Sequence, residues 1–359
     1  MTENIISENP MSFDREAEKK KMKKTFNRLG WGITVTMLIW LALLYAITIG
    51  IMVGNELLPT NALAEFYNKN MLLINEGTLL VAIIFGFLIF QTIPEELYQK
   101  KISFGGFLKI MCICFTVSYI GNIIGTIFLT YWGAFTGNEV GNELEEILSM
   151  TDPWMMVFSV GILAPLLEEL VFRKFLIDRM RKYGEVVAIL VSAGLFALFH
   201  QNFAQFLYTF AAGIMLGYLY YRTGNYWLTV LLHAIFNVIG GVLPTLLLPD
   251  ILAFSEEITA LEATLVNMQA YEEIEQMLLP IISEYGTSIL LYGLYSLFLA
   301  VVNIAGFILL IIGFRKYRAE KGSVALSAAD TIKAIVINPG MLTALILLGI
   351  LTISSLFMM

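Results

Sequence analysis

Residues 164–177 read APLLEELVFRKFLI, and four charged side chains interrupt a stretch that is otherwise apolar enough to cross a membrane: Glu168, Glu169, Arg173 and Lys174. A charged side chain at membrane depth costs several kcal/mol even on the most lenient insertion scales. Such residues are rare, and they usually mark a place where chemistry or transport occurs. The stretch therefore indicates a chemical role for two adjacent carboxylates inside a membrane helix.

The composition of the whole chain agrees with a membrane location. The chain has 359 residues, of which 58% are hydrophobic and 14% are charged. Soluble domains are roughly 45–50% apolar and about 25% charged. We therefore expect an all-α polytopic membrane protein with the lipid bilayer as its surroundings.

No motif for nucleotides or nucleic acids is present. Cys112 and Cys114 lie two residues apart in one apolar helix and face different directions, so we interpret them as core residues.

The hydropathy pattern predicts about nine spans, with eight as the alternative count, because a membrane helix needs about 20 apolar residues. The expected spans are 31–54, 77–93, 107–134, 153–176, 186–202, 203–221, 227–248, 287–313 and 341–358. We divide the chain into a basic cytoplasmic tail at 1–30, N-terminal membrane helices at 31–134, a helical core at 150–248, an external acidic segment at 249–286, and C-terminal membrane helices at 287–359.

Basic residues predict the orientation of these spans. If the N-terminus is cytoplasmic, 21 of the 22 Lys and Arg residues fall in inner segments and only Lys69 falls outside. This distribution follows the positive-inside rule. Sixteen acidic residues fall in the outer segments 55–76, 135–152 and 249–286. On this assignment Glu168 and Glu169 are expected to be the only buried acids.

The segment 249–286 contains no Lys or Arg, and its apolar residues recur at helical spacing. We interpret it as an external amphipathic helical segment, with a solvated acidic loop as the alternative.

The chain has only two histidines, His200 and His233, and both lie in apolar stretches. If the fourth and fifth spans form a hairpin that turns near residues 183–184, Glu168 and His200 lie about 15 and 16 residues from the turn, which places them nearly level. His233 lies in the same half of the membrane, and Asn237 follows it on the same helix face. The turn at residues 201–205 must then be buried in protein or line a wet cavity.

The two glutamates are expected to have different tasks because adjacent helical residues point about 100° apart. Glu169 and Arg173 are four residues apart and share a face, which predicts a charge-assisted pair. Glu168 then remains free to face a cavity, where a carboxylate can act as a general base.

Three motifs now stand in order: Glu168-Glu169-x-x-x-Arg173, Phe196-x-x-x-His200 and His233-x-x-x-Asn237. Together they resemble the motifs of the CPBP intramembrane proteases, the type II CAAX prenyl endopeptidase and bacteriocin-immunity (Abi) family. The resemblance covers about residues 150–240. It implies that Glu168 and His200 activate a water, that Arg173 braces Glu169, and that His233 and Asn237 stabilise the oxyanion.

The leading interpretation is thus that the chain is an intramembrane endopeptidase. It would be a multi-pass protein of the plasma membrane, with its active site open towards the cytoplasm. Its substrate would be a membrane-associated peptide or protein, either a prenylated CAAX-type tail or a leader or bacteriocin-type peptide. A proton- or ion-coupled transporter and a scaffold without catalysis are the alternatives. We favour no cofactor, although zinc held by Glu168, His200 and His233 is chemically possible. Arg173 beside the glutamates would weaken the attraction for a dication.

The predicted orientation can be tested by labelling. A cysteine placed at residue 265 should react with a membrane-impermeant thiol reagent added from outside the cell, because the acidic segment is expected to be external. Labelling from the cytosolic side alone would contradict the orientation.

Overall fold

The computed structural model describes residues 15–57, 61–137, 147–148, 151–265, 271–324 and 326–357, without the side chains of 262–265 and 271–275. Every regular element in these ranges is a helix, which confirms the all-α fold. The expected basic tail at 1–30 is described only from Arg15 onward, and residues 266–270 of the expected acidic segment lie outside the description.

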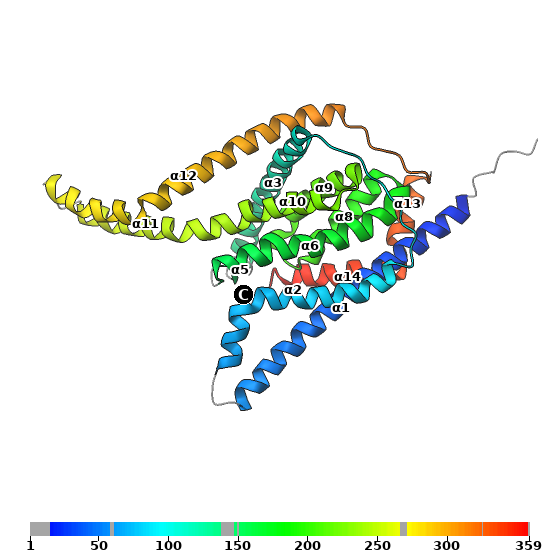
Figure 1. Ribbon diagram of the computed structural model, residues 1–359, viewed down its shortest axis with the longest axis horizontal. Coiled ribbons are helices and arrows are strands. Elements are labelled where there is room, and N and C mark those ends of the chain that lie inside the picture. Colours follow the sequence, from blue (N-terminus) through cyan, green and yellow to red (C-terminus); the bar gives the residue numbers. More distant parts are fainter. Residues whose placement is uncertain are drawn as a thin grey trace, which may run out of the picture.

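Three long helices open the chain: α1 (Arg15–Leu57), α2 (Ala62–Phe90) and α3 (Phe104–Thr136). α1 and α2 lie side by side below the centre of the molecule, and α1 also packs against α14 (Pro339–Ser354) (Figure 1). α3 begins at a serine cap, where Ser103 Oγ accepts the Gly106 N–H at 3.1 Å, and ends at Gly137 with a φ of 77°. A glycine at this position adopts the left-handed conformation without a Cβ penalty.

The charged stretch of the sequence lies in one continuous helical run from Pro153 to Tyr183. Within this run the hydrogen-bonding pattern changes repeatedly. The pieces are α5 (Pro153–Phe158), the π-helix η1 (Ser159–Leu163), α6 (Ala164–Glu169), the π-helix η2 (Leu170–Ile177), α7 (Asp178–Met180) and the 3₁₀ turn η3 (Arg181–Tyr183). π-helical turns are rare and are frequent at functional sites. The glutamate pair therefore lies between two irregular turns of its helix.

The hairpin expected after this run is present. Gly184, with a φ of 99°, connects η3 to α8 (Glu185–Phe199), which packs against both η2 and α9 (Phe203–Thr223). The turn between α8 and α9 passes through Gln201, whose φ of 53° is unusual for a residue with a side chain.

The end of α14 covers this second turn. The Phe203 N–H donates to Ser355 Oγ at 2.9 Å, and Thr352 Oγ1 donates to the Leu198 carbonyl at 3.2 Å. Asn202 caps α9 by accepting the Ala204 N–H at 2.8 Å. Backbone groups at membrane depth need such partners because lipid offers none. The turn is thus held by protein contacts, as the sequence required.

The chain continues through α10 (Tyr226–Asn237), the π-helix η4 (Val238–Val242) and α11 (Leu243–Leu265) to α12 (Tyr271–Lys316). α11 and α12 contact one another and extend together away from the body at the left of Figure 1. The Tyr285 hydroxyl donates to Glu257 at 3.1 Å across this pair. The described residues of the expected acidic segment 249–286 belong to the outer parts of these two helices.

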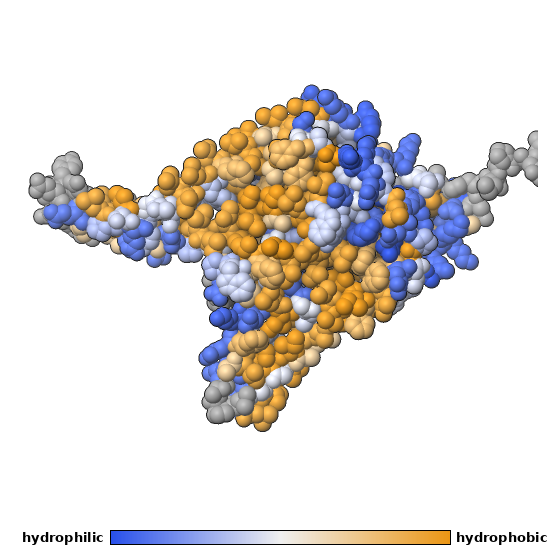
Figure 2. Space-filling view, viewed as in Figure 1, coloured by the Kyte–Doolittle hydropathy of each residue, from blue (hydrophilic) through white to orange (hydrophobic). Residues whose placement is uncertain are grey.

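Seven described helices are long and apolar enough to span a membrane, and an eighth results if α13 (Ala328–Val336) and α14, bent by 71°, count as one. The expected span 186–202 corresponds to α8, which has only 15 residues. The surface shows a broad hydrophobic band across the body, with hydrophilic residues gathered at the end that carries α13 (Figure 2). These features are those of an integral, multi-pass membrane protein.

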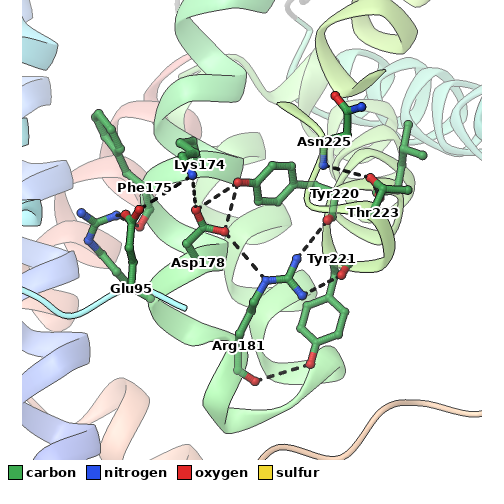
Figure 3. A network of polar contacts seen from close by, with 11 residues as sticks. Glu95, Lys174, Phe175, Asp178, Arg181, Tyr220, Tyr221, Thr223 and Asn225 are labelled. Atoms are coloured by element: carbon green, nitrogen blue, oxygen red, sulfur yellow. Dashed lines mark hydrogen bonds and ion pairs between the residues drawn. The ribbon is translucent and has the colours of Figure 1, made fainter. Parts of the chain in front are cut away.

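A buried polar network joins the end of the Pro153–Tyr183 run to α9 (Figure 3). Asp178 lies 2.9 Å from Lys174 Nζ and accepts the Tyr220 hydroxyl at 3.0 Å. Arg181 donates to the carbonyls of Tyr221 and Tyr220 at 2.7 and 3.0 Å. These bonds satisfy carbonyls in the last turn of α9, where a helix has no internal donors.

A second ionic group holds the connection between α12 and α13 against the same region. Arg222 donates through two nitrogens to the two oxygens of Glu185 at 2.8 and 2.7 Å, and through a third to Glu320 at 2.7 Å. Glu185 and Asp178 are both buried. The expectation that Glu168 and Glu169 are the only buried acids is therefore wrong, because the cationic partners of Glu185 and Asp178 make their burial tolerable.

Candidate functional site

The innermost part of the site is an ion pair without exposed surface. Arg173 Nε lies 3.1 Å from Glu169 Oε2, and both side chains are 0% exposed. The two residues are four apart, as the sequence indicated, although Arg173 belongs to a π-helical turn. The Nε–H does not align for a hydrogen bond, so the contact is mainly Coulombic. In a low-dielectric interior such an attraction is strong, and each charge makes the other tolerable.

α8 completes the surroundings of Arg173. The guanidinium carbon lies 4.6 Å from the centre of the Phe196 ring, and Nη1 lies 3.4 Å from Ser192 Oγ. The Ser192 hydroxyl in turn donates to the Phe172 carbonyl at 2.6 Å. A cation over an aromatic face gains further stabilisation when it is desolvated. Phe196 is thus part of the site, beyond its place in the motif.

His233 lies between the two glutamates. Its Nδ1 is 2.9 Å from Glu169 Oε1, and its Nε2 is 3.6 Å from Glu168 Oε2. Glu169 therefore orients the imidazole ring with one oxygen and contacts Arg173 with the other. Glu168 differs from its neighbour because its side chain keeps 17% of its surface exposed. The structure thus places one glutamate in the interior and the other at an open surface.

His200 is the C-cap residue that follows α8, in the turn before α9. Its Nδ1 lies 2.8 Å from the Phe196 carbonyl oxygen, which can accept a hydrogen bond but cannot donate one. Nδ1 therefore carries the proton, and Nε2 has a free lone pair. The ring also packs edge-on against Phe196, with centroids 4.8 Å apart. Phe196 contacts the His233 ring in the same manner at 5.7 Å and so positions both histidines.

Asn237 contacts the main chain of another helix. Its Nδ2 donates to the Val160 carbonyl at 2.9 Å, within the π-helix η1. π-helical turns displace carbonyls from the regular α-helical pattern. One amide hydrogen of Asn237 is used in this bond, and the second remains for a ligand. Tyr226 makes a similar bond from the start of α10 to the Leu166 carbonyl, at 2.6 Å.

These groups meet at a cavity of about 530 Å³. Glu168, His200, His233 and Asn237 line its wall together with residues of α2, α3, α9 and α12. Glu169 and Arg173 do not line it. The volume is within the range of pockets that hold small ligands or a short peptide segment.

Sequence reasoning missed one acidic residue of the wall, Glu76. The sequence pattern predicts that Glu76 ends an outer loop, because the apolar run begins at Gly77. In the structure α2 begins at Ala62, and Glu76 is buried in the middle of this helix with 8% of its surface exposed. Helical spacing within 62–90 was the signal that could have placed it.

The set Glu168, His200 and His233 does not fit a metal ion. No group of three His, Cys, Asp or Glu side chains among the described residues has a geometry that could hold one. In addition, the two His233 nitrogens face the two glutamates, and Arg173 places a positive charge next to them. A structural or catalytic zinc ion needs three or four ligands around one point.

Comparisons with known proteins concern the same part of the chain. Residues 150–239 match a family model described as type II CAAX prenyl endopeptidase Rce1-like. This segment contains all six site residues named from the sequence. The resemblance to the CPBP family is confirmed for this segment.

Two curated relatives are similar to this chain. The protein named "Putative membrane peptidase YdiL" from Bacillus subtilis (strain 168) is 28% identical over 159 residues, which cover 42% of this chain and 62% of that protein. The "UPF0177 protein YxdF" from Lactococcus lactis subsp. lactis (strain IL1403) is 29% identical over 99 residues, covering 27% of this chain and 55% of that protein. The chain thus spans less than two thirds of either relative. No solved structure matches it.

The buried ion pair predicts a stability effect. Replacing Arg173 by Met keeps much of the side-chain volume but leaves Glu169 without its strongest partner. We expect R173M to lower the free energy of unfolding by about 3–5 kcal/mol, measured as a lower thermal midpoint of the purified protein in detergent. The double variant E169Q/R173M should lose less than R173M because it leaves no unpaired charge. An R173M protein as stable as the wild type would contradict the pair.

Proposed function

Because residues 150–239 of this chain resemble the CPBP intramembrane proteases, we propose that the protein is an intramembrane endopeptidase that uses water as its nucleophile. One observation carries the proposal. A partly exposed glutamate, Glu168, lines a cavity with two histidines, while its neighbour Glu169 is fixed in the interior by Arg173. Paired carboxylates in unlike environments are typical of acid–base sites.

Glu168 is the general base of the proposed reaction. Its carboxylate takes a proton from a water molecule in the cavity, and the hydroxide attacks the carbonyl carbon of the scissile peptide bond. His200 supports this step because its free Nε2 can accept a hydrogen bond from the same water. The tetrahedral intermediate then collapses, and the protonated Glu168 gives the proton to the leaving amine. No covalent intermediate with the protein forms.

His233 and Asn237 act on the negative oxygen of the intermediate. His233 Nδ1 lies 2.9 Å from Glu169 Oε1, and its Nε2 lies at the cavity beside Glu168, where it is the proposed donor to this oxygen. The second amide hydrogen of Asn237 is the other donor. Donors fixed in advance around such an oxygen are an effective form of electrostatic catalysis.

Other nucleophiles are less well placed in the described cavity. Ser118 lines the wall, but it makes no hydrogen bond to either histidine. Neither cysteine lines the cavity. We therefore propose activated water, and a reaction without a metal, since the residues present do not fit one.

The substrate is proposed to be a membrane-associated peptide, either a prenylated CAAX-type tail or a leader or bacteriocin-type peptide. The charge distribution of the sequence favours cleavage near the cytoplasmic face of the plasma membrane.

Kinetics of four variants separate these roles. E168Q keeps the volume but cannot accept the proton, so kcat should fall about 10²–10⁴-fold on a cleavable membrane peptide. H200A should cost a similar factor, and the double variant scarcely more, because the two residues act as one unit. N237A should lower kcat about 10²–10³-fold with KM nearly unchanged. Full activity of E168Q would refute the proposed base.

The metal question has its own test. Purified active protein should retain its activity after dialysis against a chelator, because no step of the proposed reaction uses a metal. Elemental analysis of the same sample supplies the check. Stoichiometric zinc whose removal abolishes activity, and whose return restores it, would overturn this mechanism.

A further inference from the structure

The carboxyl group of Glu76 is an acidic feature of the cavity wall that the proposed reaction does not use. It lies in α2, it is 8% exposed, and it lines the cavity. Its Oε1 accepts a weak hydrogen bond from Asn75 Nδ2 at 3.3 Å, while its Oε2 has no hydrogen-bond partner among the residues that the structure describes. A buried polar atom without a partner requires an explanation.

Each of the other buried acids among the described residues has a cationic partner, whereas Glu76 has none. Glu169 has Arg173 at 3.1 Å, Asp178 has Lys174 at 2.9 Å, and Glu185 has Arg222 at 2.7 Å. All 22 Lys and Arg residues lie within the described ranges, yet none lies within 4.0 Å of a Glu76 oxygen. A buried carboxylate without a cation is strongly unfavourable.

The rest of the described cavity wall directs no cation at Glu76, since His233 faces Glu168 and Glu169 instead. None of the described residues that line it is Lys or Arg, and its second acid, Glu168, would add negative charge. Asn303, on α12, adds a further buried acceptor oxygen without a hydrogen-bond partner. The cavity thus offers acceptors and negative charge, which suits a ligand that brings donors and positive charge.

Glu76 also lies near the depth of Glu168. α2 and the Pro153–Tyr183 run meet where Arg179 Nε donates to the Phe90 carbonyl at 2.7 Å. From this contact Glu76 lies about 14 residues back along α2, and Glu168 lies about 11 residues back along the other run, so both lie on the same side of the contact. Both carboxylates line the same cavity.

We infer that Glu76 binds a Lys or Arg side chain of the peptide substrate, close to the bond that is cleaved. This inference rests on the proposed function and names its substrate class: a membrane-associated peptide with a basic residue near the scissile bond. The substrate cation provides the partner that the chain itself lacks. A peptide with a free carboxylate at this point finds no Lys or Arg among the described residues of the wall.

The experiment compares two peptides that differ at one residue. Both carry a reduced, non-cleavable bond, and they have Lys or its neutral analogue norleucine at the tested position. Binding is measured as the rise in thermal midpoint of the purified wild-type protein, and of E76Q, with increasing peptide concentration. Because the tested position is unknown, lysine is moved along the peptide in steps of one residue.

The wild type should bind the best lysine peptide on the order of 10–100-fold more tightly than its norleucine partner. E76Q should lose this preference and bind both peptides alike. The matched control is E65Q, which removes an exposed carboxylate from the first turn of the same helix. E65Q should retain the wild-type preference.

Two outcomes would overturn the inference: a wild type that binds both peptides equally at every position, or an E76Q variant that keeps the lysine preference. Folding of E76Q is checked by its midpoint without peptide, which should equal or exceed that of the wild type because the change removes an unpaired carboxylate. Binding does not depend on turnover. Absence of cleavage by the wild type would thus refute the proposed function alone, and a missing lysine preference in an active enzyme would refute this inference alone.

Discussion

An ionised carboxylate and a guanidinium that have no contact with water impose the main constraint on this molecule. Glu169 and Arg173 can remain charged at membrane depth only if every neighbour accommodates them, and three helices meet there: their own run Pro153–Tyr183, α8 and α10. α8 contributes the Phe196 ring and the Ser192 hydroxyl, and α10 contributes His233. Because removal of one member would leave a buried charge unpaired, the three helices are held in one arrangement. The cavity then forms on the open side of that arrangement.

The polar contacts at the end that carries α13 have a different physical role. Asp178 with Tyr220, and Arg222 with Glu185 and Glu320, tie helix ends to connecting segments. These groups have nearly all their partners within the protein. By contrast, the cavity wall keeps Glu76 Oε2 and Asn303 Oδ1 without hydrogen-bond partners among the described residues. The polar groups near α13 thus bond mainly to one another, while the cavity wall keeps acceptor atoms that a ligand could use.

The sequence predicts this architecture and site to different degrees. Hydropathy identifies the helical membrane class, and the spacing of four residues identifies the Glu169–Arg173 pair because both depend on local periodicity. Glu76 was missed because a polar residue just before an apolar run reads as a loop, although no helix breaker separates it from Ala62. The hydrogen-bond partner of Asn237 could not be predicted either. It is the main-chain carbonyl of Val160, and every residue type carries such a group. Tertiary contacts decide both cases.

The π-helical turns around the site also bear on how such a site tolerates change in chain length. A π turn holds one more residue per turn than an α turn. Deleting a single residue within η1 or η2 would let that turn return to α geometry, so the helix beyond it would keep its orientation. A deletion within α6 before Glu168 would instead turn Glu168 and Glu169 by about 100° relative to η1, with every side chain of the motif still present. Register along this one helix is therefore as much a part of the site as the identity of its residues.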